Sequence, residues 1–359
     1  MKELNAGSDG AGRGRRCVCV CVCVCLCEAS REHESAKMAD PAMLNKVIVA
    51  YVLLGLGAVA LARVLGGLAG WLLRYFLRPN AAPASYAAFR GEWAVVTGAS
   101  QGVGEGFVRE LAKRKMNVVL LARSEEKLKT LAADVERQNT GIKTKVIRFD
   151  FDSATAKDYA ALEASLKDLN VSVLVNNVGV NVPFPTDFVD VEPEAEDRIV
   201  RVNITSTNKM TRMLLPAMIA NKKGAIYMMS SAAGTVSPAP MLSIYGATKA
   251  YMDSLAISLS GEVARYNVSV QSCIPFYVVS EMSKFRKSSF TVPSATFYAK
   301  LCLDARGSDV QLNAYWPHDA MANALRLLPL KSQVSYVNDL HGKIRARALK
   351  KKEREQKAQ

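Results

Sequence analysis

Six short apolar segments recur along the middle of the chain, and enough residues for a helix separate each from the next. They cover residues 93–96, 117–121, 145–149, 171–175, 225–229 and 268–273. Strands that alternate with helices at this spacing form a parallel sheet covered on both faces, and such strands read as continuous apolar runs. The sequence therefore predicts an α/β fold with a doubly wound, Rossmann-type parallel sheet over residues 88–330.

A much longer apolar run precedes this region. Residues 47–73 carry a single charge, Arg63, and exceed the roughly 20 residues that cross a bilayer. A signal peptide would have a shorter apolar core, and a buried helix would show more periodic polar residues. We expect an N-terminal membrane-anchoring helix, transmembrane or hairpin-like, within 44–78. Because Arg74 and Arg78 follow the run, the positive-inside rule places the next domain in the cytosol.

The cysteines are concentrated before that run. Six of the eight alternate with apolar residues between Cys17 and Cys27, a spacing that fits neither a metal site nor a disulfide framework. The pattern is that of a translated dinucleotide repeat. We therefore expect residues 1–37 to be a non-native or disordered extension, with translation starting at Met38; a palmitoylated arm is the alternative. The two remaining cysteines are typical of a reduced, cytosol-facing domain.

The net charge of +14 raises the question of nucleic-acid binding. Residues 343–359 contain eight basic and two acidic residues, so much of the charge lies in a basic C-terminal tail. The rest of the chain has no basic stripe interleaved with aromatic residues. We therefore expect no nucleic-acid partner and a tail that is a solvated helix or disordered. No cluster has metal-ligand spacing, so no metal is expected, and His318 and His341 are interpreted as structural or surface residues.

A glycine-rich turn follows the first predicted strand and precedes a helix predicted over 104–115. Gly98 allows a tight turn, and Gly102 and Gly104 let the backbone approach a pyrophosphate. The helix then directs its first N–H groups at the phosphates. The pattern predicts a dinucleotide site made by Thr97, Gly98, Ser100, Gln101, Gly102, Val103 and Gly104.

The ends of the other strands supply the remaining candidate cofactor residues. Arg123 stands where an NAD site has a carboxylate, and its guanidinium suits a 2′-phosphate, which favours NADPH/NADP+ as the cofactor. We expect Asp150 to reach the adenine edge and the segment of Asn177 and Gly179 to contact the adenosine half. The segment after the sixth strand adds Pro275, Val278 and Ser280.

Ser231, Tyr245 and Lys249 form the candidate catalytic group. Tyr245 and Lys249 are four residues apart and share one face of a helix. In that position the ammonium lowers the tyrosine pKa, and the phenol can give a proton to a carbonyl oxygen near neutral pH. Ser231 could hydrogen-bond the same oxygen. The group predicts an oxidoreductase acting on C=O or CH–OH.

Residues 91–285 resemble the short-chain dehydrogenase/reductase family. The matching residues are Thr97, Gly98, Gly102, Gly104, Asn176, Asn177, Gly179, Asn203, Ser231, Tyr245 and Lys249. The resemblance implies that Tyr245 is the general acid, that Lys249 binds the nicotinamide ribose and tunes the tyrosine, and that Asn203 holds a water of the proton relay. Ser231 stands one residue farther ahead of Tyr245 than is usual. Either loop 232–237 carries an extra residue, or Ser230 and Ser231 share the role.

Residues 202–212, 215–218, 238–240 and 275–284 carry a narrower resemblance, to microsomal very-long-chain 3-oxoacyl-CoA reductases, close relatives of 17β-hydroxysteroid dehydrogenases types 3 and 12. It implies reduction of a 3-oxoacyl-CoA by NADPH in fatty-acid elongation, with elongation enzymes and the lipid bilayer as partners. It also implies an endoplasmic reticulum membrane location and is compatible with a homodimer. The family's usual dilysine signal is imperfect in residues 355–359, although a basic tail is present.

Two alternatives stay open. A 17β-hydroxysteroid or retinoid oxidoreductase needs the same four catalytic residues and the same cofactor, and we expect the discriminating substrate loop within Ser280–Asp304. A catalytically inactive membrane adaptor is the other, and the intact set of Asn203, Ser231, Tyr245 and Lys249 argues against it.

Overall fold

The computed structural model describes residues 41–73, 75 and 85–357, and the chain divides into two units, Met1–Pro79 and Asn80–Gln359. The first unit holds helix α2, Pro41–Leu72, of which Ala42–Leu72 is long and apolar enough to cross a membrane. At 1.5 Å per residue this segment is about 46 Å long, against a hydrocarbon core of about 30 Å. Its apolar side chains are exposed on all sides, as a bilayer-facing helix requires. The predicted extension 1–37 lies outside the described residues.

The second unit is built on a seven-stranded parallel sheet of order β3-β2-β1-β4-β5-β6-β7. The strands are β1 Trp93–Thr97, β2 Asn117–Ala122, β3 Thr144–Arg148, β4 Val171–Asn176, β5 Gly224–Met229, β6 Val268–Cys273 and β7 Gln311–Leu312. All six predicted strands are confirmed to within one residue. Sequence reasoning missed β7 because its two residues form no apolar run.

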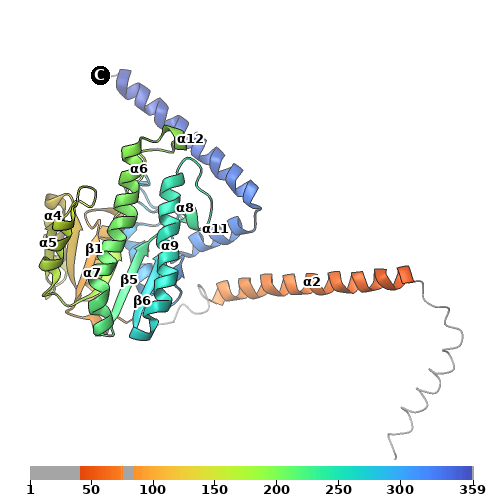
Figure 1. Cartoon of the computed structure of the whole chain (residues 1–359), viewed down its shortest axis with the longest axis horizontal. Coiled ribbons are helices and arrows are strands. Elements are labelled where there is room, and N and C mark those ends of the chain that lie inside the picture. The colour runs from red at the N-terminus through yellow and green to blue at the C-terminus, as the bar shows by residue number, and fades with distance from the viewer. Residues whose placement is uncertain (1–40, 74, 76–84, 358–359) are drawn as a thin grey trace, which may run out of the picture. The chain divides into compact units, whose positions relative to one another are not determined.

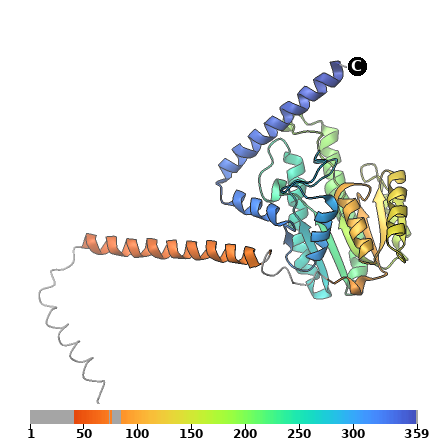
Figure 2. The ribbon, with the colours of Figure 1, turned by 180° about the vertical axis from the view of Figure 1, so that it is seen from behind.

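Helices cover both faces of the sheet. One face is covered by α3 Gly102–Lys113, α4 Glu125–Gln138 and α10 Ala295–Asp304, and the other by α5 Ala156–Leu166, α7 Ser206–Ala220 and α9 Ser243–Val263. The remaining α-helices of this unit are α6 Pro193–Val200, α8 Ala232–Thr235, α11 Trp316–Arg326 and α12 Leu330–Lys357. Figure 1 shows α7 and α9 in front of the strands, and Figure 2 shows the opposite face.

Alternate residues of each strand enter different cores. Val96 packs with α3, α4 and α10, whereas its neighbour Val95 packs with α5, α7 and α9. Successive side chains of a strand point to opposite faces, so a strand covered on both faces is a nearly continuous apolar run. The predicted doubly wound parallel sheet is therefore confirmed.

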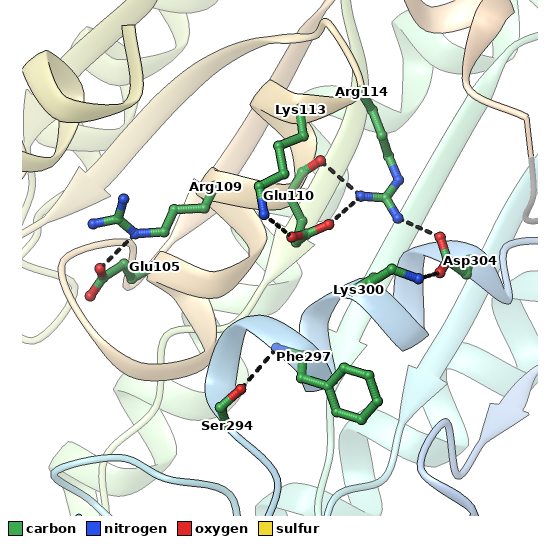
Figure 3. A network of polar contacts seen from close by, with 9 residues as sticks. All are labelled: Glu105, Arg109, Glu110, Lys113, Arg114, Ser294, Phe297, Lys300 and Asp304. Atoms are coloured by element: carbon green, nitrogen blue, oxygen red, sulfur yellow. Dashed lines mark hydrogen bonds and ion pairs between the residues drawn. The ribbon is translucent and has the colours of Figure 1, made fainter. Parts of the chain in front are cut away.

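The packing of α3 on α10 fixes the helix that follows the glycine-rich turn. Gly106 allows the close approach, because a Cβ there would lie 2.6 Å from the Ala295 carbonyl oxygen. Figure 3 shows the polar network beside it, in which Arg114 lies 2.7 Å from Glu110 within α3 and also pairs with Asp304 of α10. The orientation of α3 is thus set by backbone contact and by charge.

The basic tail predicted for 343–359 is helical to Lys357 and belongs to α12, which begins well before it. Gln333, Val337 and His341 are the buried residues of this helix, and the residues near its end are exposed. His318 in α11 is also buried, and its ring is hydrogen-bonded to the backbone of Phe276 and Thr291.

Candidate active site

The glycine-rich turn joins β1 to α3 at the carboxyl edge of the sheet. Gly98 and Gly102 have φ of +64° and +59°, backbone conformations that residues other than glycine rarely adopt. A Cβ on Gly104 would lie 2.2 Å from the Gly98 carbonyl oxygen. The structure corrects the prediction for Gly104: the missing side chain makes room for the turn itself, so that α3 packs directly against it.

Thr97 and Asn177 hold this turn in place through side-chain hydrogen bonds. The buried Thr97 hydroxyl donates to the Val175 carbonyl oxygen (3.1 Å) and accepts from the backbone N–H groups of Asn177 (2.9 Å) and Val178 (3.0 Å). Asn177 Nδ2 donates to the carbonyl oxygens of Thr97 (2.9 Å) and Gly98 (3.1 Å). The structure thus brings together two predicted residues and gives both a positioning role.

The first turn of α3 is suited to an anion. Its N-cap residue, Gln101, has an extended backbone and makes no side-chain capping hydrogen bond. Backbone N–H groups of a helix's first turn have no partner within the helix, and they favour negative charge. Ser100 is half-buried, Gln101 is exposed and Val103 packs against the core. A pyrophosphate therefore fits this cradle.

Arg123 and Asp150 follow the neighbouring strands β2 and β3. The Arg123 side chain is exposed and forms no ion pair with any described residue. Asp150 is half-buried, and its carboxylate accepts a hydrogen bond from the Asp152 backbone N–H (3.1 Å). The guanidinium is therefore available for a 2′-phosphate, as the sequence predicts.

Asn203 lies in a π-helical turn, Arg201–Thr205, between α6 and α7, a local irregularity common at functional sites. Its side-chain oxygen accepts from the Val180 backbone N–H (2.8 Å), and its nitrogen donates to the Val180 carbonyl oxygen (3.1 Å) and to Thr248 Oγ1 (3.0 Å). The Thr248 hydroxyl donates in turn to the Tyr245 carbonyl oxygen (2.8 Å). Asn203 therefore ties the segment after β4 to α9. Thr248 was missed, because no pattern in the sequence distinguishes it.

The adjacent serines after β5 have different surroundings. Ser230 is buried and donates to the Lys249 carbonyl oxygen (2.7 Å). The Ser231 hydroxyl accepts from the Ala233 backbone N–H (3.2 Å) and lies near enough to the Tyr245 phenol to lower its pKa. The chain then kinks at Gly234, with φ of +92°. Of the two alternatives for the catalytic serine, this geometry favours Ser231 beside Tyr245 and gives Ser230 a structural hydrogen bond.

Tyr245 and Lys249 share one face of α9, and the Lys249 ammonium lies 5.6 Å from the Tyr245 ring centroid. Burial raises the pKa of Tyr245, and the hydrogen bond with Ser231 lowers it in part. The structure differs here from the prediction, in which Lys249 lowers the tyrosine pKa. Lys249 donates instead to the Met229 carbonyl oxygen (2.6 Å), and burial lowers its own pKa to about 8.

The segment after β6 connects the two halves of the site. The Pro275 carbonyl oxygen accepts from the Ala232 backbone N–H (2.8 Å), next to Ser231. Val278 is buried, and Ser280 Cβ lies 3.3 Å from the position that a Cβ on Gly102 would take. The predicted residues of this segment therefore run from the neighbourhood of Ser231, the candidate catalytic serine, to the glycine-rich turn.

A small, largely apolar pocket, with room for about one water molecule, adjoins Tyr245. It is lined by Asn181, Val182, Thr186, Phe188, Val191, Ile199, Met241, Leu242, Ser243, Ile244 and Tyr245. None of these residues lies in Ser280–Asp304, where the sequence predicted the substrate loop. The segment that carries residues 182, 188 and 191 has little regular structure. Apolar residues at these three positions, outside any predicted strand or helix, were the signal by which the sequence could have indicated a pocket wall.

Residues 92–289 match the family model for short chain dehydrogenases, which is more than half of the chain. The chain is 40% identical over 268 residues to a very-long-chain 3-oxoacyl-CoA reductase of Anas platyrhynchos, covering 74% of this chain and 85% of that protein. It is 36% identical over 317 residues to a protein of the same name from Laccaria bicolor, covering 86% and 93%.

A solved structure is also similar. The short-chain dehydrogenase from Sphingobium yanoikuyae in complex with NADPH has a TM-score of 0.55 and 26% identity, covering 66% of this chain and 94% of that one. The parallel sheet, the glycine-rich turn and the group of Ser231, Tyr245 and Lys249 agree with this likeness. The chain therefore belongs to the short-chain dehydrogenase family.

Proposed function

We propose that this protein reduces very-long-chain 3-oxoacyl-CoA to 3-hydroxyacyl-CoA with NADPH. The observation that carries the proposal is the position of Tyr245, which lies beside Ser231 and lines an apolar pocket. A small apolar pocket beside a proton donor suits the apolar atoms that flank a ketone. The names of relatives that share 36–40% of their residues over most of this chain point to the same substrate class.

The cofactor fits the cradle formed by the glycine-rich turn, the first turn of α3 and Arg123. When bound, NADPH supplies the hydride for the C3 carbonyl. The Ser231 hydroxyl is positioned to hydrogen-bond the carbonyl oxygen, and the Tyr245 phenol is positioned to donate its proton to that oxygen as negative charge develops there. Lys249, with a pKa of about 8, exchanges a proton near neutral pH and is suited to restoring the phenol.

The basic loop after Ser280 supports a CoA thioester over a ketosteroid. Lys284, Arg286 and Lys287 are exposed and form no ion pair with a described residue. A CoA thioester carries several phosphate charges, which attract such cations, whereas a ketosteroid carries none.

Helix α2 supports a membrane location, because a substrate with a very long acyl chain partitions into lipid. We propose that α2 anchors the protein in the endoplasmic reticulum membrane with the reductase domain in the cytosol, beside other elongation enzymes. Association through α9 as a homodimer is compatible with the exposed side chains of Tyr251 and Ile257. Protease accessibility of the domain in sealed microsomes tests the orientation, and protection would contradict it.

Oxidation of NADPH by the detergent-solubilised protein tests the proposed reaction. We expect turnover of a long-chain 3-oxoacyl-CoA with a kcat/KM far above that for a 17-ketosteroid. Tyr245→Phe should reduce kcat by about 100-fold to 10,000-fold while NADPH binding is retained. A preference for the steroid would contradict the acyl-CoA assignment, and turnover that survives Tyr245→Phe would contradict the role of the phenol.

A further inference from the structure

Helix α12 lies beyond residues 92–289, the part of the chain that matches the family model, yet it contacts the substrate pocket from outside. Two of its residues make the contact, and they lie four positions apart on the helix. His341 Nδ1 is 2.5 Å from the Pro240 carbonyl oxygen. The Arg345 guanidinium donates to Asp187 Oδ2 (2.6 Å) and Asp190 Oδ2 (2.9 Å).

These contacts reach two different segments that line the pocket. Phe188, which lines one wall, lies between the two aspartates that Arg345 binds. Met241, which lines the other wall, directly follows the Pro240 carbonyl that His341 binds. The walls themselves meet where the Thr186 backbone N–H donates to the Met241 carbonyl oxygen (2.8 Å). Figure 1 shows α12 running past one end of α6, the helix that contributes Ile199 to the pocket.

The two contacts differ in strength. His341 is buried, whereas about half of each aspartate side chain bound by Arg345 is exposed to solvent. Exposed ion pairs are individually weak, so the wall at Asp187–Asp190 is the part that can open without unfolding the domain. Phe188 and Val189 on that wall are themselves 60% and 89% exposed.

We propose that α12 closes the pocket around the acyl chain and that Arg345 thereby determines chain-length specificity. This inference rests on the proposed function. Arg345 is a positioning residue, because it acts through the wall at Asp187–Asp190 and not on the reacting carbonyl. Closure affects a substrate only where its chain reaches that wall. A long acyl chain therefore depends on Arg345, and a short one does not.

The test compares acetoacetyl-CoA with 3-oxohexadecanoyl-CoA in full-length Arg345→Gln. We expect KM for the long substrate to rise roughly fivefold, with kcat for the short substrate unchanged. Arg347→Gln, an exposed residue of the same helix without an ion pair to a described residue, is the matched control and should change neither value. The reversed set Arg345→Glu with Asp187→Lys and Asp190→Lys should restore the long-chain KM.

A second measurement keeps the proposal independent of the reaction. Hydrogen exchange of the backbone N–H groups over residues 186–191 should accelerate in Arg345→Gln and return in the reversed set. Equal losses for both chain lengths, or unchanged exchange in this segment, would overturn the proposal. Absence of all acyl-CoA turnover in the unmodified protein, with exchange responding as expected, would instead overturn the proposed function.

Discussion

The cofactor side and the substrate side of this site are held by different forces. The glycine-rich turn is fixed by backbone packing and by buried hydrogen bonds from Thr97 and Asn177. The outer wall of the pocket is fixed by ion pairs between Arg345 and two half-exposed aspartates. Buried contacts are costly to break, whereas exposed ion pairs are not. One side is therefore built to hold a constant ligand, and the other can adapt to chains of different length.

The largest expected effect comes from filling the closest contact on the cofactor side. Gly104→Ala places a Cβ 2.2 Å from the Gly98 carbonyl oxygen, so α3 and the turn must separate. We expect the free energy of unfolding to fall by about 3 kcal/mol and NADPH binding to be lost. Thermal unfolding and NADPH titration measure the two effects.

Gly261→Ala is the matched control for this prediction. Gly261 also lies in a helix, α9, but nothing stands within 4 Å of its would-be Cβ. Alanine there should stabilise the protein by roughly 0.5–1 kcal/mol, because alanine has the higher helix propensity. If Gly104→Ala left the stability and NADPH binding as unharmed as Gly261→Ala does, the close packing of α3 on the glycine-rich turn would not be what fixes the cofactor side.

The next effect concerns Lys249, which lies between the two sides. Burial lowers its pKa from 10.5 to about 8, so the folded state binds fewer protons than the unfolded chain between these values. Stability should therefore rise with pH across this window, by about 3 kcal/mol from this residue. Lys249→Met should abolish that rise with pH. At pH 7 the variant should be about 1 kcal/mol more stable, which is the net of removing a buried charge and losing the hydrogen bond to Met229. Its kcat/KM should fall at least about 100-fold.

Denaturant unfolding at pH 7 and pH 10 measures this effect. Lys350→Met, at an exposed position of α12, is the control and should leave the pH dependence unchanged. A variant at position 249 that is less stable than the unmodified protein at pH 7 would show that the hydrogen bond to Met229 outweighs the burial of charge.

The smallest effect separates two neighbouring serines. Ser231→Ala should reduce kcat about tenfold and shift the pH profile of kcat toward alkaline values, because its hydroxyl lowers the pKa of Tyr245. Ser230→Ala removes a buried bond to the Lys249 carbonyl oxygen and should cost about 1–2 kcal/mol of stability with the pH profile unchanged. Identical pH profiles for the two variants would contradict the division of roles.

The order of strands and helices and the location of the site could be predicted from the sequence. A strand such as β2, covered on both faces, is apolar from Val118 to Ala122, so it is recognisable without its neighbours. Parallel strands also end at one edge, which is why the glycine-rich turn, Arg123 and Ser231 could be assigned to one site. The short strand β7 and the pocket segment 181–191 carry no such periodicity and escaped prediction.

The sequence by itself determined the doubly wound sheet, the family and the residue types of the site, because these depend on local patterns of apolar residues and glycines. Only the tertiary structure decided which serine faces Tyr245, why Gly104 must be glycine, and that burial lowers the pKa of Lys249. It also decided that α12 lies against the segment before Met241, through a contact between His341 and Pro240, 101 residues apart. Such properties depend on side-chain direction and burial, which distant segments create only when they pack together.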